Sequence, residues 1–187
     1  MATDKGIALV DRDEDGVDRA FREDVLAGLR HDPKAIPARW FYDAEGSRLF
    51  EKITQVEEYY PTRSETEILG ARGPEFAELI GTGRAVVEFG SGSSVKTPLL
   101  LKAIDPAAYV PLDISGDFLR ESVRPLAQRF PELLILPFEA DFTRPLTLPR
   151  TIEDMPKLGF FPGSTIGNLI PLAAIDLLRA MRASATG

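Results

Sequence analysis

Apolar residues change their spacing near residue 80 of the chain. Before that point they recur three or four positions apart, as in Val17, Phe21, Val25 and Leu29, which predicts amphipathic helices. After that point they form short continuous runs, which are typical of strands buried on both faces. The four runs cover residues 85–89, 109–112, 133–137 and 158–161.

Local signals predict where several helices begin and end. The prolines in residues 31–37 should end the first helix. Ser64 followed by Glu67 has the spacing of a capping box, which predicts a helix that begins at Ser64. The Gly-Pro pair at residues 73–74 predicts a kink or a second helix there. Pro171 suits the first turn of the last helix.

The order of these elements predicts the fold class. Strand, helix, strand, helix, strand, strand, helix is the order of a parallel sheet with right-handed crossovers. We therefore expect an α/β fold with a Rossmann-like sheet over residues 81–187 and an N-terminal helical cap over residues 1–80. Four strands make only a truncated sheet with an open edge, so a homodimer or another partner is expected to cover that edge.

Composition excludes several kinds of function. The net charge is −7, with 29 acidic against 22 basic residues, which disfavours a nucleic-acid partner. The chain has no cysteine, so thiolate chemistry is excluded and a cytoplasmic location is expected. His31 is the only histidine and has polar neighbours, so we expect it at the surface and expect no metal site. The apolar runs are too short to cross a membrane, and no signal peptide is expected.

Small or polar residues follow each predicted strand, at the edge where ligands bind in such sheets. Glycines at positions 90 and 92 would let the backbone approach a ligand closely. Asp113 ends the second run, where a carboxylate can accept hydrogen bonds from ribose hydroxyls. Asp141 and Phe142 follow the third run and could meet an adenine. The fourth run leads into a polar loop at residues 163–168.

The glycine loop differs from two common nucleotide-binding loops. A dehydrogenase fingerprint would need a glycine where Val95 stands, and no phosphate-loop Gly-Lys-Ser/Thr follows. A nucleoside without phosphates suits the loop better, and Lys96 could reach a carboxylate on it. Glu88, Asp113 and Asp141 would be costly to bury without partners. A ligand with hydroxyls, an amine and a sulfonium cation would supply such partners.

Residues 35–180 resemble the histidine-specific, S-adenosylmethionine-dependent methyltransferases of ergothioneine biosynthesis. The similarity lies in residues 40–63, in residues 88–97 and in the segments that end the later strands. Its most distinctive motifs are Tyr-Tyr-Pro-Thr-Arg at residues 59–63 and Gly-Ser-Thr-Ile-Gly-Asn at residues 163–168. The resemblance implies an N-methyltransferase that acts on the α-amino group of histidine or a related amino acid.

The resemblance also implies roles for individual residues. Tyr59 and Asn168 are expected to be the catalytic residues and to bind the amino-acid substrate. Tyr42 and Phe50 either line the same cleft or pack in the core. The residues implied to bind S-adenosylmethionine are Gly90, Lys96, Asp113, Asp141 and Phe142.

Members of the resembled family continue beyond the point where this chain ends. The alternative function is therefore a non-catalytic module that binds S-adenosylmethionine, S-adenosylhomocysteine or a protein partner. Turnover of an amine would distinguish the enzyme from such a module.

Overall fold

The computed structural model describes residues 12–93, 95–144 and 146–185, and the chain forms two compact units. The first unit is Met1–Asp43 and the second is Ala44–Gly187. Sequence expectations that involve Ser94 or Pro145 lie outside the described residues.

The first unit contains helix α1 (Arg19–Gly28) and a 3-10 turn, η1 (Ala38–Phe41). The ring of Phe21 meets that of Trp40 edge to face, with centroids 5.2 Å apart. The indole N–H of Trp40 donates to the carboxylate of Asp24 at 2.7 Å. The predicted first helix is thus confirmed, and its face that carries Phe21 and Asp24 binds the turn.

Three helices open the second unit: α2 (Ala44–Ile53), α3 (Pro61–Ala71) and α4 (Gly73–Ile80). The break predicted at residues 73–74 is confirmed, because α4 begins there as a separate helix. The capping box predicted at Ser64 is wrong. Helix α3 already begins at Pro61, since a proline needs no N–H partner in the first turn, and Ser64 therefore lies inside the helix.

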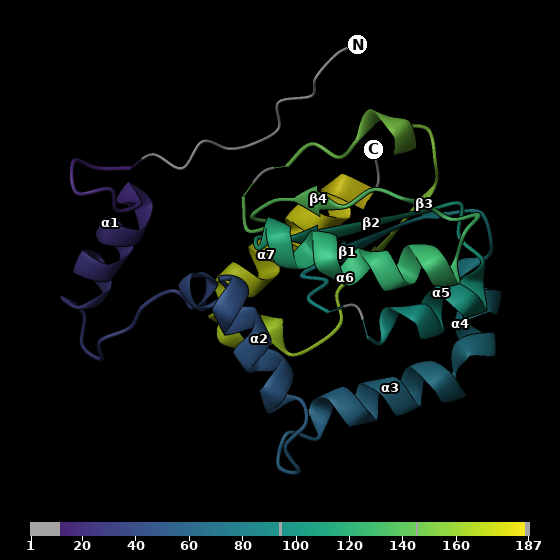
Figure 1. Ribbon diagram of the computed structural model, residues 1–187, viewed down its shortest axis with the longest axis horizontal. Helices are drawn as coiled ribbons and strands as arrows, with labels where there is room; N and C mark the ends of the chain where they lie inside the picture. Colours follow the sequence, from purple (N-terminus) through teal and green to yellow (C-terminus); the bar gives the residue numbers. More distant parts are fainter. Residues whose placement is uncertain (1–11, 94, 145, 186–187) are drawn as a thin grey trace. The chain divides into compact units, whose positions relative to one another are not determined.

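The second unit is built around a parallel sheet with strand order β3-β2-β1-β5, in which β4 also pairs with β2 (Figure 1). This arrangement confirms the predicted α/β class. The third predicted run, residues 133–137, is corrected: only Leu134–Ile135 in it form a strand, and a second short strand, Phe138–Glu139, begins after Pro137, which has no N–H to donate. The strands are β1 (Ala85–Phe89), β2 (Ala108–Asp113), β3 (Leu134–Ile135), β4 (Phe138–Glu139) and β5 (Lys157–Phe160).

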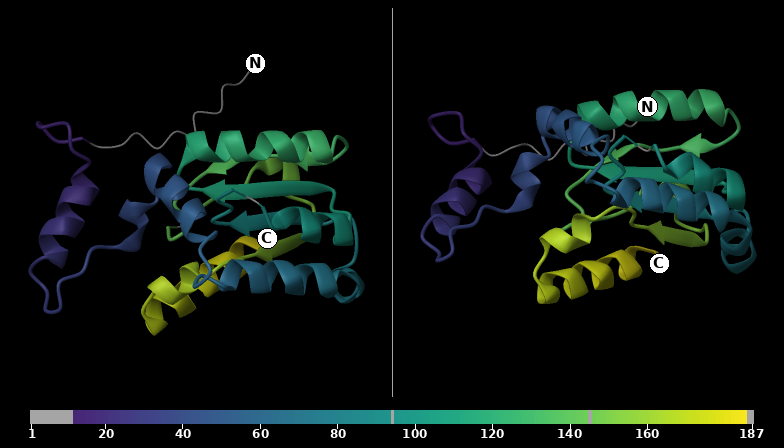
Figure 2. Two further views of the ribbon diagram at one scale, coloured as in Figure 1. Left: turned by 60° about the horizontal axis from the view of Figure 1, so that its bottom comes forward. Right: turned by 90° about the horizontal axis from the view of Figure 1, so that it is seen from below.

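Helices cover both faces of this sheet. Figure 2 shows α6 on one side of the strands and α7 on the other. The proline expected to begin the last helix does stand at its start. The remaining elements are α5 (Thr97–Ile104), α6 (Gly116–Arg129), η2 (Arg150–Ile152), η3 (Thr165–Asn168) and α7 (Pro171–Ala185).

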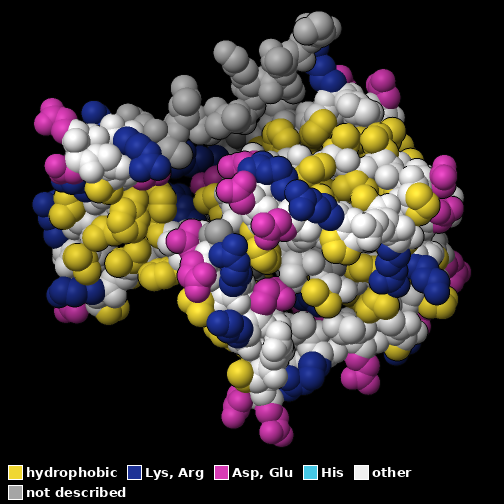
Figure 3. Space-filling model, viewed as in Figure 1, with side chains coloured by type: hydrophobic (Ala, Val, Ile, Leu, Met, Phe, Trp, Pro, Cys, Tyr) yellow, Lys and Arg dark blue, Asp and Glu magenta, His cyan; other side chains and the backbone are white. Residues whose placement is uncertain are grey.

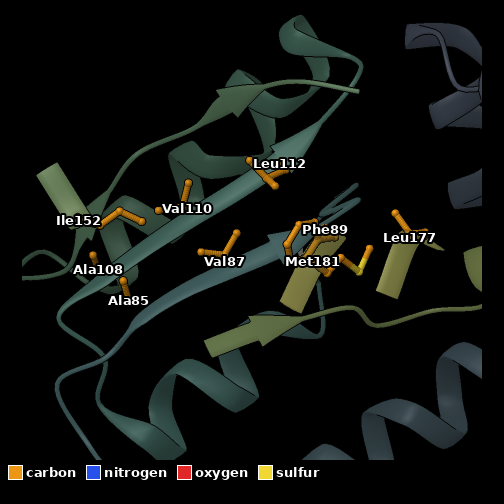
Figure 4. Close-up of a cluster of buried hydrophobic side chains, with 9 residues drawn as sticks. All are labelled: Ala85, Val87, Phe89, Ala108, Val110, Leu112, Ile152, Leu177 and Met181. Atoms are coloured by element: carbon orange, nitrogen blue, oxygen red, sulfur yellow. The ribbon is translucent and has the colours of Figure 1, made fainter. Parts of the chain in front are cut away.

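Strand β1 contributes to two hydrophobic cores, one on each face of the sheet. Val86 packs with residues of α5 and α6, including Leu101, whereas Val87 belongs to the cluster that contains Leu177 and Met181 of α7 (Figure 4). All residues of β1 and β2 are buried. Burial on both faces explains why these two strands are apolar at nearly every position rather than at alternate ones.

The surface carries mixed charges. On the face shown in Figure 3, Lys and Arg side chains are interspersed with Asp and Glu. His31 is exposed, as expected. On α7, Leu172 and Ile175 are exposed, with 72% and 45% of their surface accessible. No helix within the described residues is long and apolar enough to span a membrane.

Candidate functional site

The glycine loop after β1 folds back onto the end of β2. Gly90 and Gly92 have φ angles of 72° and 52°, in the left-handed region that glycine adopts without a side-chain clash. The backbone N–H groups of Gly90 and Ser91 both donate to the carbonyl oxygen of Leu112, at 2.9 and 3.0 Å. The loop is therefore fixed beside the carboxyl ends of two neighbouring strands.

Asp113, the last residue of β2, also holds this loop. Its carboxylate accepts hydrogen bonds from the N–H of Gly92 at 3.0 Å and from the N–H of Ser115 at 2.9 Å. Burial raises the pKa of Asp113, and these N–H donors oppose that rise. A carboxylate offers about four acceptor positions, so Asp113 can bind both N–H groups and still accept from a ligand.

Ser91, in the glycine loop, has a buried hydroxyl group. Its hydroxyl oxygen is buried and has no hydrogen-bond partner among the residues that the structure describes. A buried hydroxyl without a partner is unfavourable by about 1–3 kcal/mol. A polar ligand at the glycine loop would remove that penalty.

Glu88 is a buried carboxyl group inside the sheet, 1% exposed. It accepts hydrogen bonds from the hydroxyl of Tyr109 at 2.6 Å and from that of Thr97 at 2.8 Å. Burial raises the pKa of Glu88 to about 7, although these hydrogen bonds and the charge of Lys96 act to lower it. Glu88 therefore joins β1 to β2 and to the first turn of α5.

Lys96 forms an ion pair with Glu65 of helix α3. The other carboxylate oxygen of Glu65 accepts a hydrogen bond from the backbone N–H of Gly163 at 2.6 Å. Glu65 thus connects α3 to the loop after β1 and to the loop after β5. No local sequence pattern indicates these contacts of Glu65, because its partners are 31 and 98 residues away along the chain.

Phe142 packs against the glycine loop. Its ring meets those of Phe89 and Phe161 edge to face, with centroids 6.2 and 5.9 Å apart. A Cβ added to Gly90 would lie 3.3 Å from the Phe142 ring, so the two residues are in close contact. Gly90, Asp113 and Phe142, predicted separately, are therefore brought together around one loop.

Asp141 already has partners on its own turn. One carboxylate oxygen accepts the N–H of Thr143 at 3.0 Å, and the other lies 3.3 Å from the guanidinium of Arg144. These contacts shape the turn that carries Phe142. A contact of Asp141 with a ligand stays a prediction.

The expected substrate residues lie on two segments. Tyr59 precedes α3 and meets Phe50 edge to face, with centroids 5.8 Å apart. Asn168 ends the turn η3 and is exposed. The hydrogen bond from Gly163 to Glu65 links these two segments. Tyr42 belongs to the first compact unit, and its part in a cleft stays a prediction.

The described residues include no group of three or more His, Asp or Glu side chains arranged to hold a metal ion. At this edge of the sheet the described residues supply carboxylates, one lysine, aromatic rings and backbone N–H groups.

Comparison with known proteins identifies relatives along most of the chain. A family model described as histidine-specific methyltransferase, SAM-dependent, matches residues 21–187. The histidine N-alpha-methyltransferase of Mycolicibacterium smegmatis is 39% identical over 172 residues, which are 89% of this chain and 52% of that protein. Its counterpart in Mycobacterium tuberculosis is 40% identical over 173 residues, which are 90% of this chain and 53% of that protein.

A more distant relative carries a different substrate in its name. The 4-dimethylallyltryptophan N-methyltransferase of Claviceps fusiformis is 28% identical over 170 residues, which are 87% of this chain and 48% of that protein. The chain thus spans about half the length of these relatives.

Proposed function

The chain belongs to the family of S-adenosylmethionine-dependent, histidine-specific methyltransferases, and on that premise we propose that it binds S-adenosylmethionine for N-methylation of an amino acid. Histidine is the proposed substrate, with its α-amino group as the methyl acceptor. The names of the two bacterial relatives support histidine, and the name of the Claviceps fusiformis relative supports N-methylation of an amino acid more broadly.

One observation carries the cofactor proposal: the glycine loop is fixed beside Asp113, and the Ser91 hydroxyl in it is buried without a partner among the residues that the structure describes. A polar nucleoside fits such a loop, because the two glycines leave its backbone accessible. Asp113 would accept hydrogen bonds from the ribose hydroxyls, and Lys96 would bind the carboxylate of the amino-acid tail. Asp141 and Phe142 would contact the adenine.

S-adenosylmethionine, when bound, supplies an electrophilic methyl group on its sulfonium. The residues of the chain then have to hold the acceptor amine in the orientation that methyl transfer requires. Such positioning can lower the activation barrier by several kcal/mol. Tyr59 and Asn168 would orient the amine so that its lone pair faces the methyl group. The Tyr59 hydroxyl could pass the amine proton to water.

The two expected regions have separate roles in this proposal. Residues 81–187 would hold the cofactor, and the helical segment before residue 80 would contribute the substrate side through Tyr59. Because β5 lies at an edge of the sheet formed by the described residues, a second copy or another partner would cover it.

Calorimetric titration of this chain with S-adenosylhomocysteine tests the proposal. Saturable binding with about one ligand per chain is the expected result. A folded chain that binds neither S-adenosylhomocysteine nor S-adenosylmethionine would contradict it. A second assay follows methyl transfer to histidine by mass spectrometry. Binding without turnover of histidine or tryptophan derivatives would favour a non-catalytic binding module.

A further inference from the structure

Glu65 lies beside Lys96, the residue proposed to bind the carboxylate of the amino-acid tail. We propose that Glu65 and Lys96 form a paired-charge site for the zwitterionic end of an α-amino acid, with Glu65 binding the α-ammonium group. The inference rests on the proposed function, because the amino acid in question is the tail of the nucleoside ligand. It adds a specificity residue to that site.

The pair lies where two loops of the site meet. Lys96 follows the glycine loop of β1, and Gly163 belongs to the loop after β5, the strand next to β1 in the sheet. A Cβ added to Gly163 would lie 3.9 Å from the ammonium nitrogen of Lys96, so these loops are close even without Glu65. Glu65 reaches both of them from helix α3.

Both charged groups are partly exposed, and both can form further hydrogen bonds with a ligand. The side chains of Lys96 and Glu65 are 16% and 31% exposed. An ammonium has three N–H donors, and a carboxylate has about four acceptor positions. The ion pair and the hydrogen bond from Gly163 therefore leave capacity on both groups for further hydrogen bonds.

The combination of charges selects a zwitterion over a simple ion. A ligand with only a carboxylate would be attracted by Lys96 but repelled by Glu65. A ligand with only an ammonium group would be attracted by Glu65 but repelled by Lys96. A ligand with both groups on one carbon can place its carboxylate beside Lys96 and its ammonium beside Glu65. Partial burial strengthens these contacts relative to a fully exposed ion pair.

The test compares four ligands on the wild-type chain and on variants. The ligands are S-adenosylhomocysteine, its analogue without the α-amino group, its analogue without the α-carboxylate, and 5′-methylthioadenosine, which lacks the whole tail. The variants are Glu65→Gln, Lys96→Met and, as a matched control, Glu67→Gln, which changes an exposed residue of the same helix. Affinities are measured by calorimetry, directly or by competition.

The wild-type chain should prefer S-adenosylhomocysteine about tenfold over the analogue without the amino group, as expected for a hydrogen bond between charged groups. Glu65→Gln should remove that preference and leave the affinity for 5′-methylthioadenosine unchanged. Lys96→Met should instead remove the preference for the carboxylate. Glu67→Gln should keep the complete wild-type pattern.

Two results would overturn the inference alone. In the first, Glu65→Gln keeps the preference for the amino group, or lowers the affinity for all four ligands equally, as the substitution of a merely structural residue would. In the second, it weakens the binding of free histidine, the other α-amino acid available, and leaves the nucleoside series as in the wild type. If the wild-type chain binds none of the four ligands, the proposed function fails together with the inference.

Discussion

The carboxylate of Asp113 accepts the N–H of Gly92 at 3.0 Å, so the last residue of β2 holds the glycine loop that follows β1. The same carboxylate also accepts the N–H of Ser115 at the start of α6. Asp113 therefore shapes the loop in addition to its proposed contact with ribose. A substitution of Asp113 should therefore weaken ligand binding both by removing the ribose acceptor and by loosening the glycine loop.

Replacing Asp113 by alanine should abolish the binding of S-adenosylhomocysteine, because the ribose acceptor and the loop contact are lost together. Asp113→Asn should bind weakly, since its amide oxygen can still accept one N–H. Calorimetry measures the affinity, and circular dichroism verifies that the variants fold. Asp117→Ala, at an exposed position of α6, serves as the control. Wild-type affinity in Asp113→Ala would rule out the ribose assignment.

Gly90→Ala and Gly83→Ala form a matched pair, since both glycines have a φ of 72°. Each substitution should lower the free energy of unfolding by about 1–2 kcal/mol, because a side chain is strained in the left-handed region. Only at Gly90 would the new Cβ press on Phe142, at 3.3 Å; at Gly83 no atom of the described part of the chain lies within 4 Å of it.

We therefore expect Gly90→Ala, and not Gly83→Ala, to weaken S-adenosylhomocysteine binding roughly fivefold, equivalent to about 1 kcal/mol of overpacking. Denaturant unfolding and calorimetry on both variants measure the two effects separately. Equal affinities for the two variants would show that the contact between Gly90 and Phe142 does not matter for the ligand.

The buried Glu88 predicts a dependence of stability on pH. Burial raises its pKa from 4.5 to about 7, so between these values the folded chain keeps a proton that the unfolded chain releases. The free energy of unfolding should therefore fall as the pH rises from about 4.5 to about 7, by on the order of 3 kcal/mol from this group.

In Glu88→Gln the free energy of unfolding should fall less as the pH rises, because the amide stays neutral at every pH in this range. Urea unfolding of the wild type and the variant at several pH values between about 5 and 8 measures the difference. Glu67→Gln removes an exposed carboxylate and should leave the wild-type slope unchanged. Parallel curves for the wild type and Glu88→Gln would mean that Glu88 is ionised in the folded chain across this range.

Asn168→Ala should leave the affinity for S-adenosylhomocysteine within about twofold of the wild type and reduce histidine binding or methylation by about tenfold or more. Asn168 is exposed at the end of η3, so its removal should cost little stability. Titrating histidine into the chain saturated with S-adenosylhomocysteine measures the effect. A loss of nucleoside affinity in this variant would assign Asn168 to the cofactor rather than to the amine.

The sequence predicted the sheet well where burial is complete. Strands β1 and β2 are buried along their whole length, so their apolar runs are unambiguous. The third run was harder to interpret, because only two of its residues form a strand and a second short strand follows Pro137; both strands are partly exposed. At the start of α3 the capping-box pattern was misleading, since Pro61 sets the helix start first.

The candidate site could be predicted where residues directly follow strands. Asp113 ends β2 and the glycine loop follows β1, and these two strands are parallel neighbours in the sheet, so the topology alone predicts that they lie close together. Glu65 could not be found this way, because a glutamate on a helix usually faces solvent. Its two partners come from segments 31 and 98 residues distant, and only tertiary structure brings them together.

The central position of β1 has a consequence for the order of folding. Ala85 pairs with Ala108 on one side and with Lys157 on the other, about three times as far along the chain. Closing the longer loop is entropically more costly by about 1 kcal/mol, so β1 and β2 should join before β5 docks. Gly163 follows β5 and Lys96 follows β1. The glycine loop would therefore be fixed against Asp113 before Gly163 reaches Glu65, so the nucleoside side of the edge would assemble before the contacts of Glu65 are complete.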